Sequence, residues 1–208
     1  MNIGSALDVS ALAAMAAALG WASGLRLYAV VFITGLVGTL GWVPLPAGLQ
    51  VLQNPWVLGA SGLMLMVEFV ADKIPFVDSL WDTVHTVIRI PAGAALAAGA
   101  FGGLGGDSAS WALIAALAGG TLAATSHTAK ITSRAAVNTS PEPFSNIAMS
   151  LAGDAAVPVM LWLAYEHPAW FWPLLVVMVL IALTTIVVLF KVLRALLRRL
   201  FKPSPAAA

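Results

Sequence analysis

Long apolar stretches separated by short polar breaks make up most of the chain. Many of these stretches end at Gly, Pro or charged residues, as helices do at their termini. The apolar runs are 11–19, 25–42, 56–71, 91–101, 111–124, 147–165 and 173–190. Because a helix needs about 20 apolar residues to cross a bilayer, several of these runs predict short or broken helices. The pattern predicts an all-α, polytopic helical membrane protein with about six membrane segments.

The first two runs are separated by Ala22-Ser23-Gly24, next to Arg26. Small residues beside an arginine inside an apolar stretch are typical of the points where transporter helices unwind. We therefore expect two short helices that meet at this break. One long tilted helix is the alternative.

The stretch 76–89 differs from the apolar runs because polar residues recur in it with helical spacing. One face carries Asp78, Asp82, His85 and Arg89. The other face carries Val77, Leu80, Trp81, Val84 and Ile88. Such an amphipathic helix most simply lies in the membrane interface, with its polar face in water. The side chains of Asp78, Asp82 and His85 are also of the types that bind divalent metals, so they are the weak metal-site candidates of the chain.

Polar residues concentrate in the segment 125–154, which lies between two apolar runs. Its candidates for solute binding are His127, Lys130, Arg134, Asn138, Glu142 and Asn146. Pro141 and Pro143 predict an extended backbone around Glu142. Irregular backbone at membrane depth occurs only where it is buried in protein or lines water. We interpret this segment as a functional site at membrane depth, with a long surface loop as the alternative.

The composition supports the membrane class. Hydrophobic residues make up 61% of the chain and charged residues 9%, against about 25% charged residues in a soluble protein. The absence of cysteine excludes disulfides, thiolate metal sites and cysteine nucleophiles.

The placement of basic residues predicts an orientation in the membrane. Half of the ten Lys and Arg residues form a C-terminal cluster: Lys191, Arg194, Arg198, Arg199 and Lys202. By the positive-inside rule this basic tail, 191–208, is cytoplasmic, and counting spans backwards places Lys73 and Arg134 on the same side. The uncharged loop 44–55 and the turn 102–110 then lie outside. No Lys or Arg precedes Arg26, so the N-terminus lacks the basic region of a signal peptide.

Several motifs spread over nearly the whole chain carry a resemblance to a known family. They are Ser23-Gly24-x-Arg26, Glu68-Phe-Val-Ala-Asp72-Lys73-Ile-Pro75-x-Val-Asp78, His127-Thr-Ala-Lys130 and Arg134-Ala-x-Val-Asn138-Thr-Ser-Pro141-Glu142-Pro143-x-Ser-Asn146. With these motifs the chain resembles a family of small bacterial integral membrane proteins known as domain of unknown function 4126 (DUF4126). The resemblance implies a membrane fold and a location in the bacterial inner (plasma) membrane, but no particular activity.

Glu68 and Asp154 each lie within an apolar span, where a charged side chain costs about 2.5–3.5 kcal/mol. Together with Arg26, Lys130 and Arg134 they must therefore pair, reach water or take up protons. One interpretation is two structural ion pairs, Arg26–Glu68 and Arg134–Asp154. The other is a hydrated site in which the cations bind an anion and Glu68 or Asp154 couples its movement to a proton or ion.

These residues predict membrane transport or permeation of a small charged solute, in particular an anion or anionic headgroup, with proton coupling. On a helix, His127, Lys130 and Arg134 share a face that suits phosphate or carboxylate, with inner-leaflet headgroups as the alternative ligand. A second hypothesis is a non-catalytic membrane scaffold or assembly factor. A third is an intramembrane enzyme acting on a lipid phosphate, with His127 or Glu142 as acid or base, although no nucleophile motif accompanies them.

We treat 1–208 as a single integral membrane domain. A weak similarity between 9–75 and 109–168 raises the hypothesis of an internal repeat. The abundance of Gly and Ala favours close helix contact and suggests a homo-oligomer. The expected partners are the lipid bilayer, a small charged solute and a second copy of the chain. We expect no cofactor and no nucleic acid.

Overall fold

A computed structural model of the chain describes residues 9–102, 108–139 and 144–200. These residues form helices joined by short connections, and no strand occurs among them. The elements are α1 (Val9–Thr39), the 3-10 helix η1 (Ala47–Gln53), α2 (Pro55–Ala71), α3 (Val77–Ala100), α4 (Ser108–Val137), α5 (Phe144–Glu166) and α6 (Pro168–Leu200). The all-α prediction is confirmed.

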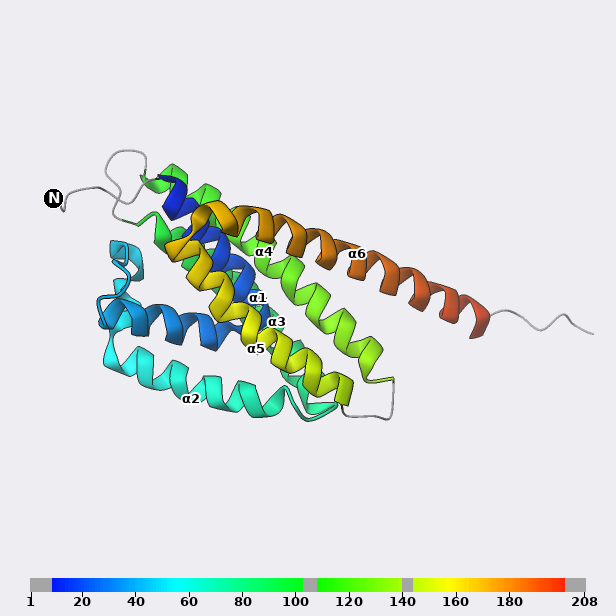
Figure 1. Cartoon of the computed structure of the whole chain (residues 1–208). Coiled ribbons are helices and arrows are strands. Elements are labelled where there is room, and N and C mark those ends of the chain that lie inside the picture. Colours follow the sequence, from blue (N-terminus) through cyan, green and yellow to red (C-terminus); the bar gives the residue numbers. More distant parts are fainter. Residues whose placement is uncertain (1–8, 103–107, 140–143, 201–208) are drawn as a thin grey trace, which may run out of the picture.

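Helix α1 bends back on itself at Arg26, whose backbone angles (φ −147°, ψ 79°) are not helical. Residues before the bend contact successive turns of α4, in the pairs Gly20–Gly119 and Gly24–Ser126. Residues from the bend onwards contact successive turns of α5, in the pairs Arg26–Ser150 and Thr34–Tyr165. Because α4 and α5 run in opposite directions, the two halves of α1 form a V with Arg26 at its apex (Figure 1). The structure therefore has the predicted break, and its non-helical residue is Arg26 itself.

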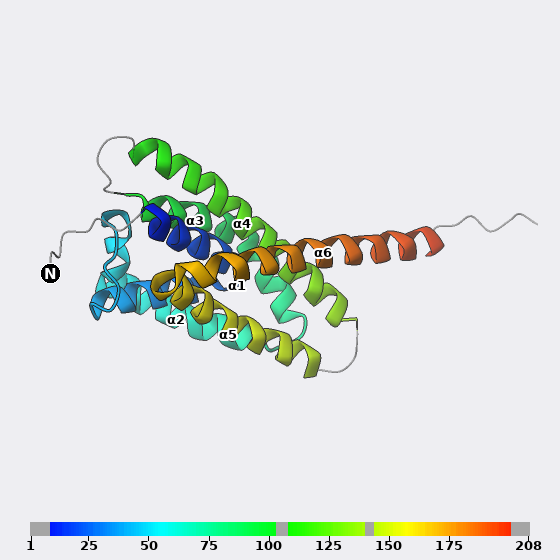
Figure 2. The same cartoon turned by 45° about the horizontal axis from the view of Figure 1, so that its top comes forward.

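Helices α2 to α6 alternate in direction along the bundle (Figures 1 and 2). The turn between α2 and α3, the C-terminal end of α4, the N-terminal end of α5 and the C-terminal end of α6 lie at one end. The other end holds η1, the turn between α5 and α6 and both outer ends of α1. Loops that we expected on a common side of the membrane thus share one end of the bundle. Helix α6 extends past its neighbours and includes residues 191–200 of the predicted basic tail, while 201–208 lie outside the described residues.

Glycines bring α1 and α4 into direct backbone contact. A Cβ atom on Gly20 would lie 2.5 Å from the Cα atom of Gly119. A Cβ on Gly24 would collide with the Ala123 carbonyl and the Ser126 hydroxyl. Close packing of this kind drives helix association in lipid, where the hydrophobic effect between helices is absent. At these positions, the small residues that suggested a homo-oligomer serve contacts within the chain.

The stretch that we predicted to lie in the membrane interface forms the first part of α3, and its orientation is the reverse of that prediction. Asp78, Asp82 and Arg89 are fully buried in the bundle, whereas Leu80 and Val87 on the opposite face are 67% and 76% exposed. A helix with its polar face inward and its apolar face outward suits a lipid environment, because water favours the opposite arrangement. The predicted solvated face is therefore wrong.

The number of spans also differs from the prediction. Among the described residues, four helices are long and apolar enough to cross a membrane (α1, α4, α5 and α6), and the bent pair of η1 and α2 makes a fifth if it counts as one span. The short runs 91–101 and 111–124 belong to longer helices, since α3 continues through Pro91 and α4 has 30 residues. The halves of the hypothetical repeat differ in shape, because α1 bends at Arg26 whereas α4 is one continuous helix.

Candidate functional site

Ten charged residues form one network inside the bundle, which we call the charge cluster. Its cations are Arg26, Lys73, Arg89, Lys130 and Arg134, and its acids are Glu68, Asp72, Asp78, Asp82 and Asp154. With all ten ionised, five positive and five negative charges sum to zero. The cluster contains every Lys and Arg of the chain outside the C-terminal five.

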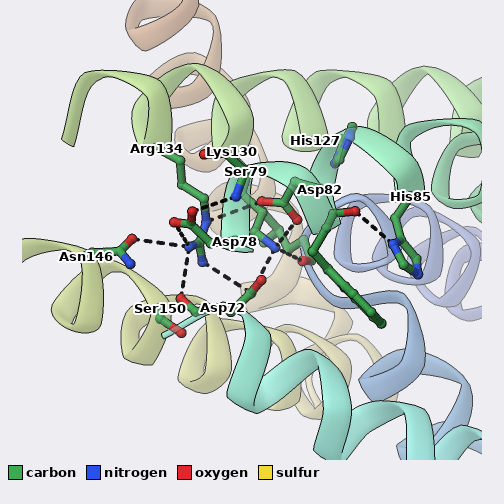
Figure 3. Close-up of polar contacts among 12 residues, drawn as sticks. Asp72, Asp78, Ser79, Asp82, His85, His127, Lys130, Arg134, Asn146 and Ser150 are labelled. Carbon is green, nitrogen blue, oxygen red and sulfur yellow. Dashed lines mark hydrogen bonds and ion pairs between the residues drawn. The ribbon is translucent and has the colours of Figure 1, made fainter. Parts of the chain in front are cut away.

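The cluster lies near one end of the bundle, where five helices meet. The C-terminal end of α2, the first half of α3, the last turns of α4 and the first turns of α5 supply most of its residues. The apex of α1 reaches it from the other end, and α6 contributes none of the ten charges. Figure 3 shows the side chains converging from these helices.

Arg26 joins the apex of α1 to α2 and α5. Its guanidinium pairs with Asp72, the C-cap residue of α2, and its Nη2 lies 2.8 Å from Oδ1 of Asp154. The same Nη2 donates to the carbonyl and the hydroxyl of Ser150, at 3.0 and 2.9 Å. Lys73 holds the other oxygen of Asp154 at 2.9 Å. The side chains of Asp154 and Lys73 are 20% and 22% exposed and those of the other acids 0%, so Asp154 is where an acid of the cluster reaches the surface.

Arg134 lies among three acids supplied by α2 and α3. Its Nη1 is 2.6 Å from Asp78, its Nη2 is 3.2 Å from Asp72 and its Nε is 3.3 Å from Asp82. Nη1 also donates to the side-chain oxygen of Asn146 at 3.2 Å, as Figure 3 shows. Arg134 is 1% exposed, and these contacts compensate the cost of burying its charge.

The innermost part of the cluster is the contact of Arg89 with Glu68 and Asp82, at 2.5 and 2.7 Å. All three side chains are fully buried. Lys130 then links Asp82 to Asp72, at 2.8 and 3.0 Å. Each buried acid of this part therefore contacts at least one cation, as the low dielectric requires.

The ion pairs that we predicted, Arg26–Glu68 and Arg134–Asp154, are wrong in their partners. Glu68 lies one helical turn deeper in α2 than Asp72, so it contacts Arg89 while Arg26 contacts Asp72. Of the three alternatives expected for charges within the apolar spans, the structure shows the first, since each of the five contacts an opposite charge.

Donors from α4 cover the backbone carbonyls that precede the bend of α1. The carbonyls of the last turn of a helix have no partner within it. Ser126 donates to the carbonyl of Trp21 at 2.7 Å, and Lys130 donates to that of Leu25 at 3.2 Å. The remaining contact joins Nδ1 of His127 to the Gly24 carbonyl at 3.2 Å. These bonds let the helix end inside the protein.

The other predicted binding residues have structural contacts. His127 is buried and its Nε2 lies 2.8 Å from the Thr86 hydroxyl. Asn138 donates to Asp78 at 3.1 Å. Glu142, with Pro141 and Pro143, lies outside the described residues, and its predicted role and extended backbone stay predictions.

The weak metal candidates do not form a metal site. Asp78 and Asp82 contact cations, and His85 faces elsewhere, with its Nε2 3.1 Å from the Tyr28 hydroxyl and its ring stacked on Trp81. Over the described ranges, no group of three or more His, Asp or Glu side chains is arranged to hold a metal ion.

A cavity of about 220 Å³ lies against the charge cluster, between α5 and α6 on one side and α1 and α4 on the other. The two outer helices, α5 and α6, diverge from their common turn (Figures 1 and 2). Arg26, Lys130 and Arg134 belong to the cavity wall, whereas His127, Asn138 and Asn146 do not. Most of the remaining wall is apolar. Ala152 and Ile181 line the cavity and are exposed at the bundle surface, so the cavity opens at the side of the bundle.

Nη1 of Arg26 and Nε of Arg134 have no hydrogen bond but form ion pairs with Asp72 and Asp82. Two further N–H groups of residues that line this cavity have neither kind of contact within the described residues. They are Nε1 of Trp21 and Nε of Arg26, and the two residues are 2% and 1% exposed. A buried donor without an acceptor costs about 1–3 kcal/mol. Unmet donors beside a cavity indicate a place for an acceptor from outside the chain.

Sequence reasoning assigned Arg26, Lys130 and Arg134 to the site but did not assign Asp72, Arg89 or Trp21 to it. A signal for Asp72 exists, since it follows Glu68 by four residues and so shares its helix face. The apolar sequence around Trp21 carries no such signal.

In the described part of the chain, an apolar exterior surrounds a buried charge cluster and four helices are long and apolar enough to cross a bilayer, as in a helical membrane protein. The family described as Domain of unknown function (DUF4126) matches residues 13–189, so the chain belongs to this family. Searches of curated proteins and of solved structures gave no match.

Proposed function

We propose that the protein moves a small anion across the membrane together with a proton. Arg26 binds the anion, Lys130 and Arg134 add positive potential, and Asp154 carries the proton. The observation that supports this most is the position of Arg26. It lies at the bend of a broken helix and in the wall of a cavity, and its Nε–H has no partner.

The charge balance of the cluster supports the coupling to a proton. Five cations and five acids leave no net charge, so a bound anion adds one uncompensated negative charge inside the bundle. Such a charge is costly in a low-dielectric interior, and a proton taken up at the same time removes it.

Asp154 suits the proton-carrying role better than Glu68, the other sequence candidate. Its carboxylate pairs with Arg26, which also lines the cavity, and its side chain is 20% exposed. The side chain of Glu68 is fully buried and pairs with Arg89. An anion that draws the guanidinium of Arg26 towards the cavity weakens its contact with Asp154, which favours protonation of that acid.

For the arrangement in the membrane, we propose that α2 to α6 cross the bilayer and that α1 enters and leaves on one side. The positive-inside rule then places the C-terminus and the charge cluster at the cytoplasmic side of a bacterial inner membrane. A homo-oligomer remains part of the proposal, since a chain of 208 residues encloses little space alone.

The proposal is tested by uptake of radiolabelled alkylsulfonates into proteoliposomes, because these anions do not cross a bilayer as neutral acids. Wild-type protein is expected to raise uptake above that of protein-free liposomes. Arg26→Gln should lower it about tenfold or more, since a lost charge-assisted hydrogen bond is worth about 1.5–3 kcal/mol. Arg26→Lys should retain part of the activity.

Lys191→Gln is the matched control, because Lys191 is an exposed cation of α6 outside the cluster. Its uptake should equal that of the wild type. If folded Arg26→Gln protein carries alkylsulfonates as fast as the wild type, Arg26 does not bind the anion. If the wild type itself carries none of the anions tested, the non-transporting scaffold becomes the better explanation of the cluster.

A further inference from the structure

The cavity beside Arg26 has a mostly apolar wall that includes three cations, and this composition narrows the class of ligand. Apart from the three cations, its polar lining residues are Ser126, Ser133 and Thr185, and Ser126 already donates to a carbonyl. Met149, Met178 and Ile181 line the part formed by α5 and α6. Methionine side chains adapt to ligands of irregular shape.

The cations on the cavity wall differ in whether they have an N–H donor without an acceptor. The ammonium group of Lys130 has three donors and three acceptors, on Leu25, Asp72 and Asp82. Arg26 keeps its Nε–H free, and the Trp21 indole N–H is free as well. Two free donors match the two oxygens of one carboxylate, or two oxygens of a phosphate monoester.

A strongly hydrated inorganic anion fits this site poorly. It would exchange its water shell for two donors and an apolar wall, which leaves much of its charge without partners. An anion with an alkyl chain avoids this cost because the chain buries apolar surface against α5 and α6. The sideways opening at Ala152 and Ile181 also gives such a molecule a route from the bilayer.

From these observations we infer that the cavity binds an anionic amphiphile, with a carboxylate or phosphate head on Trp21 and Arg26 and an alkyl chain between α5 and α6. This inference rests on the proposed function, since it names the substrate class of the same site.

The test measures binding of radiolabelled octanoate to the protein in nanodiscs of zwitterionic lipid, with empty nanodiscs subtracted. Octanoate and octyl phosphate should compete for one site, and acetate and inorganic phosphate should compete at least about a hundredfold more weakly. Shortening the chain should weaken binding about fourfold for each methylene removed, the factor expected from the burial of one methylene group. Octanamide, which has the same chain without the charge, should not compete.

Paired variants locate the site. Ala152→Phe fills the cavity mouth and should weaken octanoate binding about tenfold or more, because the ring takes the space in which the alkyl chain is buried. Ala155→Phe places the same side chain three residues along α5, outside the cavity lining, and should leave binding unchanged. Trp21→Phe removes one donor and should weaken binding about tenfold. With 5-fluorotryptophan, the fluorine resonance that is missing in Trp21→Phe should shift with octanoate and stay in place with octanamide.

The outcomes separate the two proposals. Equal binding by Ala152→Phe and Ala155→Phe, or acetate as effective as octanoate, overturns the amphiphile site. Alkylsulfonate uptake without octanoate binding overturns it too and leaves anion transport standing. Octanoate binding with the predicted variant pattern, but with no uptake of any anion, supports the site and overturns transport.

Discussion

At the scale of single residues, the cations of the charge cluster divide into two kinds. Lys130 and Arg134 are surrounded by acceptors from several helices, and removal of Arg134 would leave Asp78 without its cation. Arg26 has the same ion-pairing role through Asp72 and Asp154, but one of its donors is free beside a cavity. In our proposal, this difference separates Arg26, which binds the anion, from residues that hold the helices together.

The pair of Arg89 and Glu68 provides a test of the structural role. Arg89→Met leaves Glu68 buried without a cation and should lower the free energy of unfolding by about 3–5 kcal/mol. The double variant Arg89→Met with Glu68→Met should be more stable than the single variant, because no unpaired carboxylate then remains at that position. Thermal unfolding in detergent measures both.

The control for this pair is Lys191→Met, which removes an exposed cation outside the cluster and should leave stability unchanged. A double variant no more stable than Arg89→Met alone would contradict the buried ion pair.

The sequence identifies which charged residues lie within apolar runs, but it does not identify their ion-pair partners. Arg26, Glu68 and Asp154 stand out because they interrupt apolar runs. Which acid each arginine meets depends on the depth of each helix in the bundle, and one helical turn moves a side chain by about 5.4 Å. That depth is set by packing between distant segments, such as Gly20 on Gly119, which no local pattern encodes.

At the scale of elements, the bend of α1 and the orientation of α3 position the site. The bend follows from a local signal, since Ser23 and Gly24 next to Arg26 predict it from sequence alone. The orientation of α3 does not, because an amphipathic pattern fixes two faces without saying which one meets water. In α3 the polar face turns inward, because α2 and α4 offer charged partners there.

The contact between α1 and α4 is tested by glycine substitutions. Gly24→Ala places a methyl group against the Ala123 carbonyl and the Ser126 hydroxyl, so the two helices must separate. We expect strong destabilisation, on the order of 1–3 kcal/mol or more, as for overpacked cores. Gly59→Ala is the matched control on α2, where a Cβ meets nothing within 4 Å. It should be neutral or stabilising by up to about 1 kcal/mol.

Thermal unfolding of the two glycine variants in detergent decides this point. Equal stability of Gly24→Ala and Gly59→Ala would show that α1 and α4 are not in backbone contact at the bend.

At the scale of the whole molecule, the distribution of side chains is the reverse of that in a soluble protein. Trp56, Leu80 and Val87 are 67–87% exposed, while Arg26, Arg89 and Arg134 are at most 1% exposed. Composition predicts the membrane class directly. The path of the chain through the bilayer is harder to predict, since a bent helix such as α1 has the length and hydropathy of a crossing one.

The path of the chain is tested with single cysteines, which the natural sequence lacks. A membrane-impermeant thiol reagent reaches one face of the membrane in inside-out vesicles and the other face in right-side-out vesicles. Cysteines at Ile74, Thr139 and Lys191 should all react from the same side. Gln50 belongs to η1 and His167 to the turn between α5 and α6, and both elements lie at the opposite end of the bundle. Cysteines at these two positions should therefore react from the other side. Gln50 and Lys191 reacting from the same side would contradict the arrangement.

The central claim, that an anion moves together with a proton carried by Asp154, is tested most directly by uptake of octanesulfonate under an imposed pH gradient. Proteoliposomes containing the wild type and a pH-sensitive dye should take up the anion faster when the outside is acidic, and their lumen should acidify by one proton for each anion. Asp154→Asn should remove both the gradient dependence and the acidification. Glu166→Gln, an exposed acid of the same helix outside the cluster, should retain both. Gradient-driven uptake that persists in folded Asp154→Asn protein would contradict the account.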